Sequence, residues 1–191
     1  MKKIIAMILG LTLLFGCTAQ AENAGKENFG TLNVNGEFQI RGQIPEGYRL
    51  SILDSNSTNI YALISSEEAG KPQMTLSIAF NDLFTGEDGT AMRLNDVEDE
   101  GIEAIKAGFQ EQIPDAVFED AETALGTRLL VVRGHVDEDS GIVVFYSVYQ
   151  SYEVELAVVM GMDDGDVDLT EEQIAKIIDF LTNLDFIPNQ A

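Results

Sequence analysis

The chain has 191 residues, of which 33 are acidic and 11 are basic, so its formal net charge is −22 at pH 7. A surface with this charge repels nucleic acid and anionic lipid head groups, and it attracts cations and basic partners. The hydrophobic fraction of 45% is enough for one folded domain with a core. Cys17 is the only cysteine, which excludes an internal disulfide.

The first 21 residues have the order of a bacterial secretory signal. Lys2 and Lys3 form a positively charged start, an apolar run follows over residues 4–15, and small residues come after it. The apolar run is too short for a stable membrane span, which needs about 20 such residues. We therefore expect residues 1–21 to be a signal peptide that is removed on export.

Two cleavage sites are compatible with this signal. The segment Leu14–Cys17 resembles the lipobox of bacterial lipoproteins, in which the cysteine becomes the acylated N-terminus. Ala19–Ala21 is an A-x-A site, and cleavage there would release a soluble protein that begins at Glu22. The position of the only cysteine favours lipidation at Cys17. The acyl chains would then hold the domain at a membrane surface, with about 0.8 kcal/mol for each buried CH₂ group.

Residues 22–36 are rich in Asn, Gly and charge, and we expect a flexible tether there. The end of this segment could already join the fold, because Leu32 and Val34 alternate with polar residues. A single domain is predicted over residues 37–188, followed by a tail at 189–191. Apolar alternation predicts four strands in its first half, at 38–41, 48–53, 60–64 and 74–80. The last of these has small or polar residues on one side, so we expect that side of the sheet to be solvated or thinly covered.

A helix is predicted over residues 96–112, because apolar residues recur there at helical spacing and Pro114 ends the pattern. Strands are then expected at 117–124, 127–136, 142–150 and 153–161. The last two are apolar on both faces, which is typical of the centre of a sheet. Thr170 and Gln173 form a capping box at the start of a second helix, predicted over residues 170–184.

The succession of predicted strands and helices over most of residues 37–188 is similar to that of a known family. Its parts are Phe38–Ile40, the turn Ile44–Tyr48, the strand Met74–Phe80, the paired strands of Thr127–Gly161 and the helix Thr170–Leu184. In this pattern the chain resembles the family that contains the photosystem subunit PsbP and the bacterial lipoprotein DcrB. The resemblance implies an α+β fold in which an antiparallel sheet is sandwiched between helices, an α/β/α sandwich. It also implies an adaptor or assembly factor rather than an enzyme.

His135 is the only histidine in the chain. As a general base it would need a nucleophile and an orienting carboxylate within reach, and no G-x-S-x-G element supplies the serine. We therefore expect an exposed strand end at this position. A transition-metal site based on this histidine is not expected either, since the mature chain offers neither a second histidine nor an internal cysteine.

An acidic segment precedes the second predicted helix, and its carboxylates are Asp163, Asp164, Asp166 and Asp168. Clustered carboxylates beside a flexible glycine suit Ca²⁺, which takes six to eight oxygen ligands. The EF-hand register fails, however, because Leu169 falls where that loop needs glycine. An acidic loop is also favoured at a helix N-terminus without any metal. Calcium is thus the one cofactor that the sequence suggests.

These observations predict a non-enzymatic, exported lipoprotein of the bacterial cell envelope. Its domain would bind an envelope protein or a small ligand, and the lipid anchor would hold it at the membrane. One alternative is a freely secreted or periplasmic acidic domain whose binding is modulated by calcium. A second alternative is an enzyme that uses two carboxylates, such as Glu46 and an Asp at a strand end, which should share a cleft and have separated pKa values.

Overall fold

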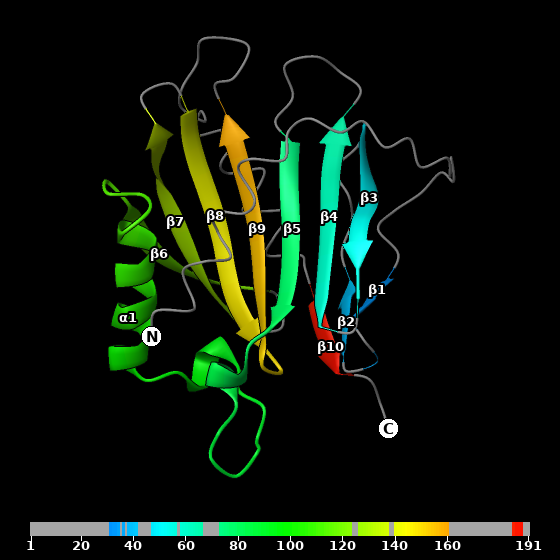
Figure 1. The fold of residues 1–191 in the computed structure, drawn as a ribbon, viewed down its shortest axis with the longest axis vertical. Coiled ribbons are helices and arrows are strands. Elements are labelled where there is room, and N and C mark those ends of the chain that lie inside the picture. Colours follow the sequence, from blue (N-terminus) through cyan, green and yellow to red (C-terminus); the bar gives the residue numbers. More distant parts are fainter. Residues whose placement is uncertain are drawn as a thin grey trace.

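The structure is a computed structural model, and it describes residues 31–34, 36, 38–41, 47–56, 58–66, 73–123, 126–137, 140–160 and 185–188. Within these residues, seven strands form one antiparallel sheet in the order β3-β4-β5-β9-β8-β7-β6 (Figure 1). The strands are β3 (Tyr48–Ser55), β4 (Asn59–Ser66), β5 (Gln73–Phe80), β6 (Val117–Glu122), β7 (Arg128–Asp137), β8 (Ser140–Tyr149) and β9 (Tyr152–Met160). The central pair, β8 and β9, was expected at the centre of the sheet, and this prediction is confirmed.

A second, three-stranded antiparallel sheet is formed by two strands from the early part of the described chain and one strand from its late part. It has the order β1-β2-β10, with β1 at Thr31–Val34, β2 at Phe38–Arg41 and β10 at Asp185–Pro188. Phe38 and Phe186 from this sheet are buried in the same core as Leu76 and Phe145 of the large sheet. The small sheet therefore covers one face of the large sheet.

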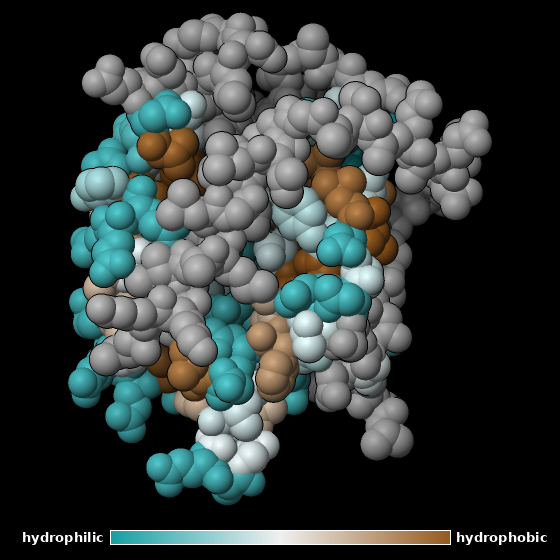
Figure 2. All heavy atoms as spheres, viewed as in Figure 1, coloured by the Kyte–Doolittle hydropathy of each residue, from teal (hydrophilic) through white to brown (hydrophobic). Residues whose placement is uncertain are grey.

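The opposite face of the large sheet carries the helix α1 (Asp99–Gln110). Ile105 and Phe109 of α1 pack with Val132 and Tyr146 in a second core, and the rings of Phe109 and Tyr146 meet edge to face at 5.6 Å. The outward side of α1 is polar, and Figure 2 shows hydrophilic residues over it. Two short 3₁₀ turns, η3 (Asp82–Phe84) and η4 (Leu94–Asp96), lie between β5 and α1 in the chain.

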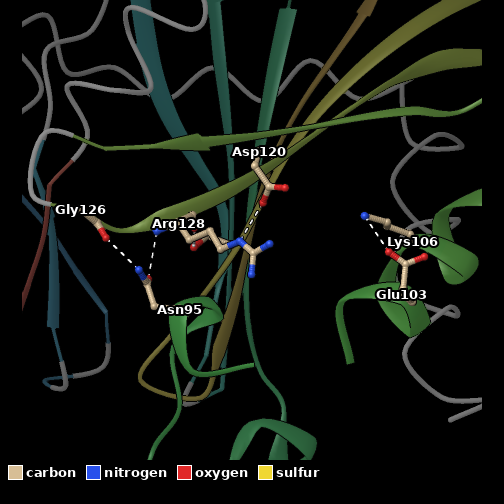
Figure 3. Close-up of polar contacts among 7 residues, drawn as sticks. Asn95, Glu103, Lys106, Asp120, Gly126 and Arg128 are labelled. Carbon is tan, nitrogen blue, oxygen red and sulfur yellow. Dashed lines mark hydrogen bonds and ion pairs between the residues drawn. The ribbon is translucent and has the colours of Figure 1, made fainter. Parts of the chain in front are cut away.

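A hydrogen-bond bridge fixes η4 to the hairpin of β6 and β7 (Figure 3). The amide of Asn95 donates to the carbonyl of Gly126 at 3.0 Å and accepts from the N–H of Arg128 at 3.0 Å. The guanidinium of Arg128 in turn contacts Asp120 on the neighbouring strand at 2.7 Å. This bridge holds the segment before α1 against the sheet, so that the helix begins in a defined place.

The predicted α/β/α sandwich is wrong. The sheet is antiparallel as expected, but one of its faces is covered by the three-stranded sheet, and the structure is mostly β. The strand β2 was predicted, and Leu32 and Val34 of β1 do alternate with polar residues, but alternation within a four-residue strand does not show which strands it pairs with. β1 is formed by the end of the predicted tether, and β10 follows directly on the second predicted helix. That helix, at 170–184, lies outside the described residues.

The strand β5 differs from its prediction in how it is covered. We expected its small and polar side to be solvated or thinly covered, whereas Thr75 and Ala79 on that side are buried. Phe80, on the apolar side of the strand, is 45% exposed at the end of the strand. Both faces of this part of the sheet are therefore covered, and the polar residues there become candidates for a site.

The turn between β8 and β9 is tightly held. Gln150 and Ser151 both have a positive φ, of 52° and 64°, which is uncommon for residues other than Gly, Asn or Asp. The buried hydroxyl of Ser151 donates to the carbonyl of Phe84 at 2.8 Å and accepts from Thr85 at 3.0 Å. The N–H of Asn81 also donates to the carbonyl of Ser151, at 2.9 Å. These bonds fix Asn81 beside the first residues of β9.

Candidate functional site

Two glutamates of β9 share one face of the large sheet. Glu153 and Glu155 are two residues apart, and alternate side chains of a strand point to the same side. Val154 and Leu156 belong to the core under the small sheet. Ala157, which shares the side of the two glutamates, belongs to the core under α1. The two acids therefore lie on the α1 side, and Glu153 is only 7% exposed there.

A row of polar side chains crosses the sheet at Glu155. The strand register places Ser77 opposite Glu155 on one side and Tyr146 opposite it on the other. Tyr61 lies opposite Ser77 on the next strand. Directly opposed residues of antiparallel strands have Cβ atoms about 5 Å apart, so these four side chains are successive neighbours. We call Tyr61, Ser77, Glu155 and Tyr146 the acidic row.

Glu153 lies next to the row and is held by two donors. Its Oε1 accepts a hydrogen bond from the hydroxyl of Tyr146 at 2.8 Å, and its Oε2 accepts one from the side-chain amide of Asn81 at 3.0 Å. Burial raises the pKa of Glu153 above its usual range, although both hydrogen bonds act in the opposite direction. The two bonds fix the position of this carboxylate, and each of its oxygens accepts one of them.

Glu155 differs from Glu153 because no described residue donates a hydrogen bond to its carboxylate. Burial, and then the negative charge of Glu153, raise the pKa of Glu155 to about 8. At neutral pH Glu155 therefore carries a proton. Part of its surface is still reached by solvent, while protein atoms surround the carboxylate closely enough to desolvate it.

The two tyrosines of the row stay neutral at physiological pH. Burial and the nearby charge of Glu153 raise the pKa of Tyr146 well above its usual value. Burial alone raises the pKa of Tyr61. The acidic row thus combines one acid without a partner, one hydroxyl and two neutral phenol rings. Such a set can accept hydrogen bonds from a donor-rich group and can hold a positive charge beside aromatic rings.

Most of the site residues that were predicted from the sequence are not among the residues that the structure describes. Cys17, Glu46 and the four aspartates of the suggested calcium segment (Asp163, Asp164, Asp166 and Asp168) lie outside the described residues. Across the part of the chain that the structure describes, no three His, Cys, Asp or Glu side chains gather in a way that could hold a metal ion.

His135 lies near the end of β7, and its side chain is 40% exposed. Its Nδ1 contacts Asp115 at 2.6 Å, and its backbone N–H donates to the same carboxylate at 2.9 Å. Hydrogen bonds from His135 lower the pKa of Asp115 below its usual value. This pair ties the end of β7 to the segment that follows α1.

Our sequence analysis did not single out Glu153 and Glu155, although a signal was present. They are the only charged residues in the run Tyr152–Met160, which is otherwise apolar on both faces. A charge in a strand expected at the centre of a sheet must be buried, and buried acids mark candidate sites. What the sequence could not provide was the register, which places Ser77 and Tyr146 beside Glu155.

Comparisons with known proteins add no functional information. No family model and no curated protein matches this chain. The resemblance to the PsbP and DcrB family therefore stays a prediction. Within the described residues, no helix is long and apolar enough to cross a membrane.

Proposed function

We propose that this chain is an exported, lipid-anchored protein of the cell envelope whose domain binds a positively charged group at Glu155, beside the fixed carboxylate of Glu153. The observation that carries the proposal is the carboxylate of Glu155, which has no hydrogen-bond partner among the described residues and lies beside a second, fixed carboxylate. A buried carboxylate is unfavourable unless it is paired. A bound cation would supply the missing partner.

The charge of the whole chain supports the same ligand class. A net charge of −22 draws cations toward the surface and raises their rate of encounter. Exposed acids of α1, such as Asp99, Glu100 and Glu103, add to this field on the side of the sheet that carries Glu155. The long-range attraction and the local pair of acids therefore both favour positively charged ligands.

The arrangement supports binding better than catalysis. A carboxylate enzyme needs one acid to donate a proton and a second to act as base or nucleophile. Glu155 holds a proton and could serve as the acid. Each oxygen of Glu153, however, already accepts a hydrogen bond, from Tyr146 or from Asn81, and these two donors weaken the carboxylate as a base or nucleophile. We therefore propose a binding role without covalent chemistry.

The proposal is tested by calorimetric titration of the purified protein with three cationic probes: butylammonium, butylguanidinium and calcium. At least one probe is expected to bind the wild type and to lose at least tenfold in affinity in Glu155→Gln. The matched control is Glu122→Gln, which removes one charge from an exposed position on the edge strand β6 and should leave binding unchanged. The binding proposal fails if no probe binds in a way that depends on Glu155.

The anchor is tested separately, by the intact mass of the protein from the membrane fraction of a bacterial host. Our proposal expects a mature chain that begins at acylated Cys17. A chain that begins at Glu22 and is recovered from the soluble fraction would show that the domain is released instead of anchored.

A further inference from the structure

We infer that the group bound at the acidic row is a primary ammonium ion, and that it enters in exchange for a proton held by Glu155. This inference rests on the proposed cation-binding function and names both the ligand class and the way in which binding is coupled to pH. The ammonium ion arrives already protonated. The proton of Glu155 leaves to solvent, and no covalent bond to the ligand forms or breaks.

The acceptors of the row match the donors of an ammonium group. A primary ammonium ion has three N–H donors on one compact charge. Three side chains of the row, Tyr61, Ser77 and Glu155, have no hydrogen-bond partner among the described residues. They stand on three adjacent strands, at directly opposed positions. The row therefore carries one carboxyl and two hydroxyl groups, on residues whose Cβ atoms are about 5 Å apart from one strand to the next.

The fourth member of the row contributes a fixed aromatic ring. The hydroxyl of Tyr146 is bound to Glu153 at 2.8 Å, and its ring packs on Phe109 of α1 at 5.6 Å. A ring held in this way stays next to Glu155 when a ligand arrives. Tyrosine rings attract cations through their negative faces, so Tyr146 and Tyr61 at the two ends of the row favour a positive charge between them.

The same geometry disfavours the two other cation classes. Calcium takes six to eight oxygen ligands, whereas the oxygens of Glu153 already accept hydrogen bonds from Tyr146 and Asn81. Among the described residues, no group of three or more His, Cys, Asp or Glu side chains could hold a metal ion. A guanidinium ion is a flat fork that binds best when both oxygens of a carboxylate face it in its plane. Acceptors spread over three strands suit three divergent N–H groups better than one planar pair.

The proton exchange follows from the groups that face Glu155. From its own strand β9 it meets the charge of Glu153, from β8 the neutral phenol of Tyr146, and from β4 the neutral phenol of Tyr61. Ser77 on β5 does not titrate, and α1 presents buried apolar residues such as Phe109 to this side of the sheet. Burial, and then the charge of Glu153, raise the pKa of Glu155 to about 8, and no described cation acts in the opposite direction. A bound ammonium ion would act in that opposite direction.

The test is calorimetric titration with butylammonium in phosphate and in MOPS buffer, whose ionisation enthalpies differ. At pH 7 we expect about 0.9 proton to be released for each butylammonium bound, since a group with a pKa near 8 is mostly protonated there. The affinity should rise about tenfold from pH 6 to pH 7 and level off above pH 8. Glu155→Gln should lose the proton release together with the affinity, and Glu122→Gln should keep both.

Two further probes test the role of the N–H donors. Tetramethylammonium has the charge but no N–H group, and it should bind at least tenfold more weakly than butylammonium; butanol should not bind. The inference is overturned if butylammonium binds without releasing a proton, if tetramethylammonium binds as tightly, or if only butylguanidinium or calcium binds through Glu155. In the last case the proposed cation-binding function stands. If none of the cations binds through Glu155, the proposed function itself is wrong.

Discussion

The substitution Glu155→Gln should stabilise the protein, and the gain should depend on pH. The pKa of Glu155 is raised from 4.5 to about 8 in the folded protein. An acid with a raised pKa binds its proton more tightly in the folded state than in the unfolded state. The stability that the proton provides is therefore complete below pH 4.5 and is lost as the pH rises to 8. Glutamine resembles the protonated acid and does not titrate.

The size of the effect follows from the two pKa values. Each unit of pKa difference corresponds to about 1.36 kcal/mol, so a shift from 4.5 to about 8 corresponds to up to about 5 kcal/mol above pH 8. This figure is an upper bound, because part of Glu155 is reached by solvent and can relax when charged. Even half of it would be about 2.5 kcal/mol, a large fraction of the stability of a typical domain.

The assay is urea unfolding of the wild type, Glu155→Gln and Glu122→Gln at pH 5, 7 and 9. Far-UV circular dichroism is the suitable signal, since the chain has no Trp. At pH 5 the wild type and Glu155→Gln should differ by less than about 1 kcal/mol in the free energy of unfolding. The difference should grow at pH 7 and again at pH 9. A difference that is the same at pH 5 and pH 9 would refute the reasoning, as would an equal effect in the Glu122 control.

Three other substitutions test how the fold holds the site. Ser151→Ala should destabilise the protein by about 0.5–1.5 kcal/mol in urea unfolding, because the carbonyl of Phe84 loses one of its two donors and the hydroxyl of Thr85 loses its acceptor; an unchanged midpoint would contradict this. Gly134→Ala should lower stability by about 1–3 kcal/mol, since its Cβ would lie 2.3 Å from Ile113 Cγ2; a neutral effect would show that this contact relaxes freely. Gln150→Asn should raise stability by about 0.5 kcal/mol, because Asn tolerates a positive φ of 52° better than Gln; a loss would mean that the Gln side chain contributes more than the turn.

The sequence predicted the large sheet better than the overall architecture. Long strands such as β5, β7, β8 and β9 have enough residues for apolar alternation or a two-sided apolar run to identify them, and α1 has enough turns to show helical spacing. The strand β2 of the small sheet was predicted, but the sheet itself was not, because its strands β1 and β10 are far apart in the chain. Their pairing through β2 is a long-range contact that no local pattern encodes.

The candidate site was missed for a related reason. A glutamate on a strand is recognisable in the sequence, but its neighbours across the sheet are set by register. Ser77 and Tyr146 are far from Glu155 in the chain and become adjacent only when β5, β9 and β8 pair. Asn81 reaches Glu153 because the turn at Ser151 fixes the segment after β5. Such contacts follow from the fold as a whole.

The measurement that tests the account most directly is the titration of the Glu155 carboxyl by ¹³C NMR, assigned by comparison with Glu155→Gln and recorded with and without butylammonium. We predict an apparent pKa near 8 for the free protein, with Glu153 titrating as the coupled member of the pair. Saturating butylammonium should lower the pKa of Glu155 below its value in the free protein. A pKa of about 4.5 in the free protein, unchanged by the ligand, would contradict both the buried acid and the site that we propose for it.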